Sequence, residues 1–186
     1  MHDDAHIIAT VRRWVQEVVV GLDLCPFARQ PWEGDTIGFR VSHAQGTTGL
    51  YKDTVDALDG FLNADPAQES TTLFICPDAL PDFDDFNDYL CDLEDNLEAT
   101  GLAPLVQIVG FHPDYRFQDA APDDAANYTN RSPWPMIHFI RPEDMEAALA
   151  HTPDPNAIPE ANIVRLREIG HADMAERLAR IKGNAD

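Results

Sequence analysis

The sequence predicts an α/β protein with a mostly parallel sheet of about four strands, the last one antiparallel, helices packed on the sheet and a helical C-terminal tail. Three observations predict this fold. Apolar residues recur at helical spacing in several segments, and short apolar runs lie between those segments. The chain has 186 residues, of which 44% are hydrophobic and 25% charged, which suits one globular domain over residues 1–186.

The first predicted element is a helix that begins at Asp3 or Asp4 and ends near Gly21, because its apolar residues recur every three or four positions. A proline-containing loop follows, and the first strand is expected over residues 36–42. The next helix is expected over residues 48–63, with its buried face formed by Tyr51, Val55, Leu58 and Leu62.

A second strand is predicted over residues 71–76, followed by a helix over 82–99 whose first turns carry acids, where negative charge is favourable. Residues 105–111 form a nearly continuous apolar run, which is typical of a strand buried on both faces. After a long irregular stretch comes a fourth strand over residues 136–140. The tail is expected to form three helices, over residues 142–150, 159–169 and 171–182.

The order of these elements predicts where polar residues meet. Strands separated by packed helices normally run in the same direction, so the first three strands are expected to share a carboxyl edge. The fourth strand, reached by a loop without a helix, is expected to run antiparallel and to begin at that same edge. Ligands of open α/β sheets bind beyond the carboxyl ends of the strands, where this chain places His43, Asp78, His112, Asp114 and residues 130–132.

The net charge of -20 limits the partners of the protein. With 33 acidic against 13 basic residues, the chain lacks the basic footprint expected for binding nucleic acid or an anionic membrane surface. Two interpretations stay open: a solvated surface that keeps the protein soluble, or an acidic face for a basic partner. The second interpretation points to the acids of the 82–99 helix, namely Asp84, Asp85, Asp88, Asp92 and Asp95.

Three cysteines, Cys25, Cys76 and Cys91, are an odd count without paired spacing, which argues against a disulfide framework. The N-terminal residues lack the basic region and cleavage site of a secretory signal. No apolar run approaches the ~20 residues needed to cross a bilayer. We therefore expect a cytoplasmic protein with reduced thiols.

The loop between the third and fourth strands is the richest in chemistry. His112, Asp114 and Arg116 offer an acid/base, an orienting carboxylate and a fixed cation. Further donors suited to a carboxylate or phosphate follow in the same loop: Asn127, Asn130, Arg131 and Ser132. Alternatively, these residues cap turns and pin the loop. If Arg131 binds a ligand, the Arg131→Ala change is expected to leave stability nearly unchanged.

Cys25 is a second candidate for chemistry. Pro26 suits the first position of a short helix, which would make Cys25 its N-cap, and Arg29 would then help to favour a thiolate and hence a nucleophile. The alternative is a small buried thiol packed beside Phe27. A metal site built from His112, Asp114 and His138, with Cys25 or Asp124 as a further ligand, is also chemically possible.

Four stretches resemble an uncharacterised bacterial family, the domain of unknown function 1415: GLDLCPFA, TTLFICPDALPDFDDFNDYL, FHPDYRF and DDAANYTNRSPWPMIHFIR. The resemblance covers about residues 15–151. It implies that the Cys-Pro-Phe and His-Pro-Asp-Tyr blocks belong to one shared site, but it implies no activity, cofactor or catalytic residue. The chain contains no P-loop, GxGxxG, GxSxG, HExxH, CxxC or kinase signature.

The leading hypothesis is a small-molecule enzyme, or a binder of a small anionic ligand, with its site at the strand carboxyl edge. In the catalytic form His112 is the acid/base, Asp114 orients it and Cys25 is the nucleophile. The alternatives are a metal-dependent protein that uses His112, Asp114 and His138, and an acidic interaction module without catalysis. The sequence identifies neither a cofactor nor an oligomeric state.

Overall fold

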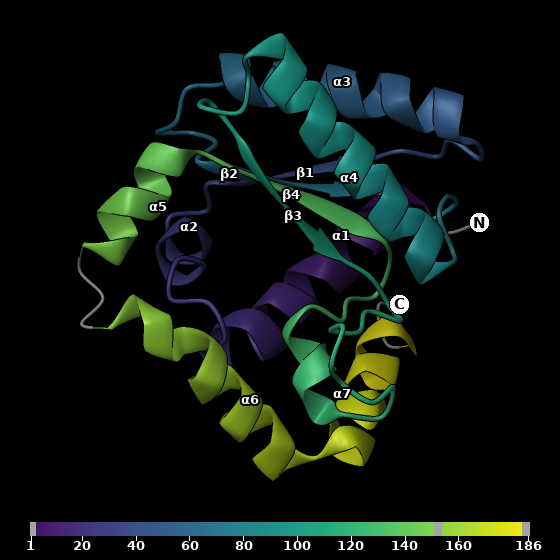
Figure 1. The fold of residues 1–186 in the computed structure, drawn as a ribbon, viewed down its shortest axis with the longest axis vertical. Helices are drawn as coiled ribbons and strands as arrows, with labels where there is room; N and C mark the ends of the chain where they lie inside the picture. Colours follow the sequence, from purple (N-terminus) through teal and green to yellow (C-terminus); the bar gives the residue numbers. More distant parts are fainter. Residues whose placement is uncertain (1–2, 151–153, 184–186) are drawn as a thin grey trace.

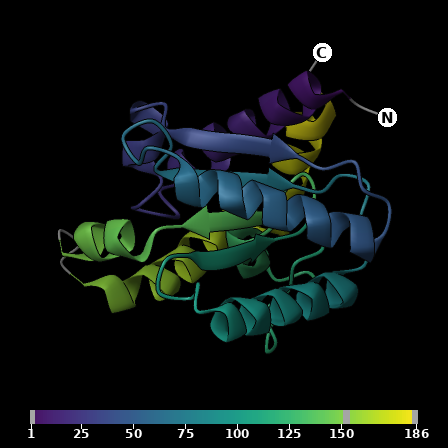
Figure 2. The same ribbon diagram turned by 90° about the horizontal axis from the view of Figure 1, so that it is seen from above.

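The computed structural model describes residues 3–150 and 154–183 and contains one four-stranded sheet between two layers of helices (Figures 1 and 2). The strands are hydrogen-bonded in the order β1 (Ile37–Val41), β2 (Thr71–Ile75), β4 (Met136–Ile140) and β3 (Gln107–Phe111). Apart from the short helix expected at Pro26, the predicted helices and strands all occur within two residues of their expected bounds.

The directions of the strands decide which ends share an edge. β1 and β2 are parallel, whereas β4 is antiparallel to both β2 and β3, so β1, β2 and β3 all point the same way. The shared carboxyl edge is therefore confirmed. The description of the sheet as mostly parallel is wrong, because β4 is inserted between β2 and β3 and only the β1–β2 pair is parallel.

The two helical layers cover opposite faces of the sheet. In Figure 1, the layer above the sheet contains α3 (Thr47–Asn63) and α4 (Phe83–Thr100). The layer below the sheet contains α1 (Asp4–Trp14), α6 (Ile158–Ile169) and α7 (His171–Gly183). Two short helices lie beside these layers, α2 (Arg29–Glu33) and α5 (Pro142–Leu149).

Each helical layer buries its own set of apolar side chains against the sheet. Towards α3 and α4 the core contains Phe61, Phe74, Phe86, Ile137 and Phe139. Towards α1, α6 and α7 it contains Trp14, Ile75, Met136, Leu166 and Met174. Alternate residues of β4 thus enter opposite cores, as expected for a strand covered on both faces.

Local signals in the sequence explain where the helices begin and end. The Asp3 side chain accepts a hydrogen bond from the His6 N–H at 2.8 Å and caps α1, which continues as a π-helical segment (Val15–Val20) to Gly21. Asp82 caps α4 in the same way, and Gly101 ends that helix with a φ of 74°, a left-handed conformation that glycine adopts without strain.

Two expectations about burial are wrong. Tyr51 and Val55 on α3 are each 42% exposed. Thr54 lies on the buried face instead, because its hydroxyl donates to the Leu50 carbonyl and accepts from the Tyr89 hydroxyl, which satisfies its polar group. β3 is not buried on both faces either, because it is an edge strand and Gln107 is exposed.

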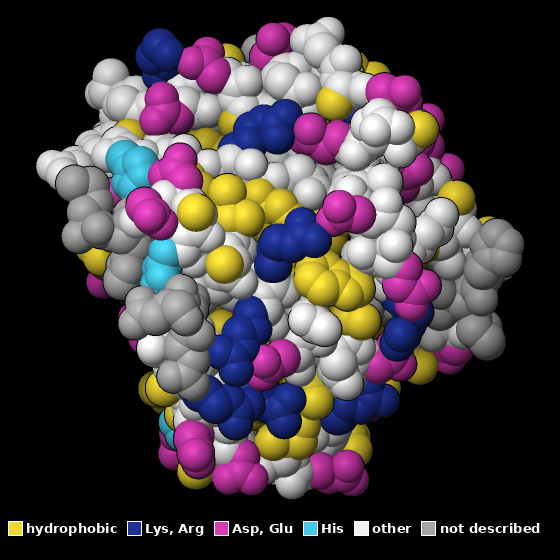
Figure 3. Space-filling model, turned by 180° about the vertical axis from the view of Figure 1, so that it is seen from behind, with side chains coloured by type: hydrophobic (Ala, Val, Ile, Leu, Met, Phe, Trp, Pro, Cys, Tyr) yellow, Lys and Arg dark blue, Asp and Glu magenta, His cyan; other side chains and the backbone are white. Residues whose placement is uncertain are grey.

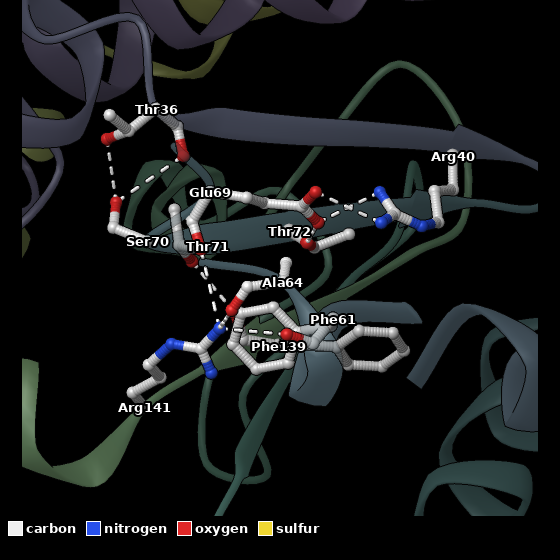
Figure 4. A network of polar contacts seen from close by, with 10 residues as sticks. All are labelled: Thr36, Arg40, Phe61, Ala64, Glu69, Ser70, Thr71, Thr72, Phe139 and Arg141. Atoms are coloured by element: carbon white, nitrogen blue, oxygen red, sulfur yellow. Dashed lines mark hydrogen bonds and ion pairs between the residues drawn. The ribbon is translucent and has the colours of Figure 1, made fainter. Parts of the chain in front are cut away.

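Two arginines contact the end of α3 and the segment that leads into β2, at the amino edge of the sheet (Figure 4). Arg141 follows β4, is 6% exposed, and donates to the Phe61 and Ala64 carbonyls at the end of α3, at 2.8 and 3.3 Å. Arg40 on β1 pairs with Glu69 at 2.9 Å. The Glu69 carboxylate fits here because Gly38 has no side chain, since a Cβ there would lie 2.5 Å from Glu69 Oε1.

Charged side chains are unevenly distributed over the surface. Figure 3 shows Lys and Arg side chains gathered on the lower half of one face, among Asp and Glu side chains. Arg13 and Arg180 pair with Glu17 at 2.6 and 3.4 Å, and Arg177 donates to the Glu17 carbonyl. These contacts tie α7 to the π-helical segment. Among the described residues, no helix is long and apolar enough to cross a membrane.

Candidate functional site

Two adjoining cavities lie at the carboxyl edge of the sheet, where the strand-end blocks meet. The first has a volume of about 350 Å³ and is lined mainly by prolines and by Asp78, His112, Trp134 and Lys182. The second has a volume of about 410 Å³ and is lined by Pro81, Asp82, Phe83, Asp84, Asp114, Arg116, Pro122 and Arg131. Pro81 contributes to both cavities. The predicted edge therefore does bring His112, Asp114, Arg116 and Arg131 together.

His112 is fully buried, and both of its ring nitrogens are bonded to backbone. Nε2 donates to the Leu80 carbonyl at 3.1 Å, and Nδ1 accepts from the Asp114 N–H at 3.0 Å. The ring also packs against Phe83 and Phe86. Burial lowers the pKa of His112, which keeps it neutral, as these two bonds require. The acid/base role stays a prediction, but the contacts leave no nitrogen free for it.

Three of the predicted ligand donors are also engaged within the protein. Asn127 and Ser132 are fully buried, and Asn130 is half-buried. Their side chains bond to backbone groups of the surrounding loops: Asn127 to the Phe117 N–H and the Ala121 carbonyl, Asn130 to the Gly110 carbonyl and Ser132 to the Trp134 carbonyl. This matches the alternative interpretation, in which these residues fix the shape of the loop.

Arg131 combines a structural role with an exposed charge. Its Nε donates to the Tyr115 carbonyl at 3.0 Å and its Nη2 to the Pro122 carbonyl at 2.7 Å, while the guanidinium lies 4.9 Å from the centre of the Tyr128 ring. Among the described residues, no carboxylate pairs with it. Neither Asp114 nor Asp123 is its partner. A positive charge fixed by carbonyls is positioned but not neutralised.

Arg116 and Asp114 line the same cavity and are both exposed. Arg116 reaches the first turn of α4 and bonds both carboxylate oxygens of Asp84, at 3.2 and 3.3 Å. An ion pair this exposed contributes at most about 1 kcal/mol, so Arg116 can exchange its partner at little cost. The Asp114 carboxylate pairs with no cation of residues 3–150 and 154–183.

Cys25 lines neither cavity. The helix expected to begin at Pro26 begins at Arg29 instead, and Cys25 packs against the core beneath α1. Burial raises the pKa of its thiol, and Arg29 faces Asp23 and Glu33, at 3.7 and 3.8 Å. The expected helix N-cap at Cys25 is therefore wrong, and Cys25 lies outside both cavities.

The proposed metal ligands do not converge. His112 packs against Phe86 on the α4 side of the sheet, whereas His138 lies beside Phe111 on the opposite face. The His138 ring bonds the Thr71 hydroxyl, and burial lowers its pKa to about 4. No group of three or more His, Cys, Asp or Glu side chains in the described part of the chain is placed to hold a metal ion.

Asp124, the other suggested ligand, is engaged by Arg167 through two hydrogen bonds of 3.1 and 2.7 Å. These bonds lower the pKa of its carboxyl to about 2. Asp124 also accepts from the Ala126 N–H and so begins the short 3₁₀ helix within the loop. It therefore anchors the loop to α6.

The sequence did not predict the contact between His43, at the end of β1, and Asp4. His43 Nδ1 lies 2.7 Å from Asp78 Oδ2, and His43 Nε2 lies 2.8 Å from Asp4 Oδ1. The positions of His43 and Asp78 at neighbouring strand ends signal the first contact. Nothing in the local sequence signals Asp4, which comes from α1. Phe83 and Lys182 were missed as cavity residues because both lie on helices assigned to packing.

A comparison with protein families gives one match. The family model described as "Protein of unknown function (DUF1415)" matches residues 6–176 of the chain. This confirms the resemblance noted from the four sequence stretches. No curated protein and no solved structure matches the chain.

Proposed function

The chain belongs to the DUF1415 family, and from that premise we propose that it binds a small anionic molecule, a carboxylate or a phosphate, in the second cavity. The observation that carries the proposal is Arg131. A guanidinium presents five N–H donors in a planar fork that matches these anions. Two of its nitrogens are held by carbonyls, and no described residue accepts a hydrogen bond from Nη1.

The rigid setting of Arg131 favours binding because little conformational entropy is lost when a ligand arrives. The Tyr115 and Pro122 carbonyls and the Tyr128 ring hold the guanidinium in place before the anion enters. Arg116 supplies a second guanidinium to the same cavity once it leaves Asp84. Together the two arginines offer an anion charge-assisted hydrogen bonds from two sides.

Binding is the function that this geometry supports best. The catalytic form of the proposal would need an acid/base, and His112 has both nitrogens bonded to backbone. It would also need a nucleophile, and Cys25 lies outside the cavity. The exposed acids of α4 support no second proposal, because a solvated helix face would expose the same side chains.

The proposal is tested by titrating isotope-labelled protein with inorganic phosphate and with succinate at constant ionic strength. We expect saturable shifts of the Arg131 Nε–H resonance and of the backbone amides near Tyr115. Arg116→Ala should weaken binding by about tenfold, the loss of one charge-assisted contact. Arg29→Ala removes an equally exposed, ion-paired arginine outside the cavity and should leave the affinity unchanged. Absence of saturation, or equal effects of the two variants, would overturn the proposal.

A further inference from the structure

We infer that the ligand of the second cavity is a zwitterion of the amino acid type, with its carboxylate on Arg131 and its ammonium group on Asp114. This inference rests on the function proposed above and deepens it by naming the ligand class. It arises from the charges that remain in the cavity after the internal contacts are counted.

Three carboxylates and two guanidinium groups line the cavity. The Asp82 carboxylate is used as a helix cap, since it accepts from the Asp84 and Asp85 N–H groups at 2.9 and 3.2 Å. Asp84 pairs with Arg116. Arg131 and Asp114 are left, and within the described ranges neither has a partner of opposite charge. Apart from Asp82, whose charge is stabilised at the N-terminus of α4, the cavity thus retains one cation, Arg131, and one anion, Asp114, without an oppositely charged partner in the part of the chain that the structure describes.

The backbone holds these two groups close together but unpaired. The Asp114 N–H donates to His112 Nδ1, and the carbonyl of the next residue, Tyr115, accepts from Arg131 Nε. His112 and Arg131 therefore fix two successive residues of the same turn. A ligand with only a negative charge would be repelled by Asp114, and one with only a positive charge by Arg131. A ligand that carries both charges is attracted by both residues.

The remaining walls indicate the third feature of the ligand. Pro81, Phe83 and Pro122 present apolar surface to the same cavity. Such surface favours an apolar side chain, because removing it from water is favourable. An amino acid with an aliphatic side chain fits all three features. Its side chain would lie against the prolines and the Phe83 ring, with the two charged groups on Arg131 and Asp114.

The test compares three probes of similar shape: leucine, 4-methylpentanoate, which lacks the amine, and 3-methylbutylamine, which lacks the carboxylate. In the parent protein leucine should bind at least about tenfold more tightly than either analogue, the effect of one lost charged contact. Asp114→Asn should reduce leucine binding to the level of 4-methylpentanoate without weakening the latter. Asp119→Asn, an exposed acid of the same loop outside the cavity, should change neither affinity.

The outcomes separate this inference from the function on which it rests. The inference of a zwitterionic ligand is wrong if 4-methylpentanoate binds as tightly as leucine, or if Asp114→Asn leaves the ratio of the two affinities unchanged. In both cases the proposal of anion binding stands. If phosphate, succinate and all three probes fail to bind, the proposed function fails as well. If 3-methylbutylamine binds best, the site is a cation site, and both statements are overturned.

Discussion

Arg131 and Arg141 stand at opposite ends of β4 and make the same kinds of contact. Each donates to backbone carbonyls, and each lies over an aromatic ring, Arg131 at 4.9 Å from the centre of Tyr128 and Arg141 at 4.2 Å from the centre of Phe61. They differ in exposure. Arg141 is 6% exposed and closes the end of α3, whereas Arg131 is half-buried and lines a cavity.

The comparison shows that an arginine without an acidic partner can have two different roles in one fold. At the amino edge of the sheet, the guanidinium of Arg141 completes the hydrogen bonds of a helix terminus. At the carboxyl edge, the guanidinium of Arg131 completes the hydrogen bonds of a loop and still borders open space. If this is correct, changes at the amino edge should cost stability alone, and changes at the carboxyl edge should cost binding as well.

The largest effect is expected for Arg141→Ala. This change removes the hydrogen bonds to the Phe61 and Ala64 carbonyls and the packing on the Phe61 ring, and it should lower the free energy of unfolding by about 3 kcal/mol. Urea denaturation measures the loss. Arg141→Met keeps apolar contact and removes the buried charge, so its loss should be smaller. If Arg141→Ala lowers the free energy of unfolding by less than about 1 kcal/mol, the contacts of Arg141 stabilise the fold no more than a surface ion pair does.

Arg131→Ala should have the next largest effect, a loss of about 2 kcal/mol, because water can reach part of the loop and solvate the freed carbonyls. This reverses the sequence-based prediction of nearly unchanged stability, since the Tyr115 and Pro122 carbonyls use this guanidinium. The variant should also lose phosphate binding, which Arg141→Met should retain. Thermal melts with and without phosphate check both statements. Equal phosphate affinities of Arg131→Ala and Arg141→Met would show that the two edges of the sheet do not differ in binding.

The smallest effect concerns pH. The contacts with Asp78 and then Asp4 raise the pKa of His43, so the stabilisation is complete below the unfolded value near 6.5 and is lost as pH rises through the higher folded value. Melting temperatures measured from about pH 6 to about pH 9 should therefore fall more steeply for the parent than for His43→Gln. If the melting temperatures of both proteins fall equally with pH, the protonation of His43 does not stabilise the carboxyl edge.

The sequence predicted the positions of the strands because apolar spacing reflects packing, and their directions because of the connections between them. It also predicted the meeting of residues 112–116 with residues 130–132, which follows from strand direction alone. It did not predict the hydrogen-bond partners of single side chains. The bonds of His112 depend on which carbonyl a distant loop presents, and apolar spacing carries no such information. The face on which His138 lies was not predicted either, because β4 is covered on both faces, so no polar alternation marks the side of each residue.

Apart from the Asp124–Arg167 and Arg116–Asp84 ion pairs, the loop of the site is anchored by side chains that bond to main-chain atoms. His112, Asn127, Asn130, Arg131 and Ser132 all do so. A main-chain carbonyl is the same whatever residue carries it. Substitutions at Tyr115, Phe117 and Ala121 therefore leave in place the main-chain groups that Arg131 and Asn127 bond. The loop thus keeps its shape through its backbone, and side chains along it can be exchanged in laboratory variants while the hydrogen bonds that position the guanidinium of Arg131 are retained.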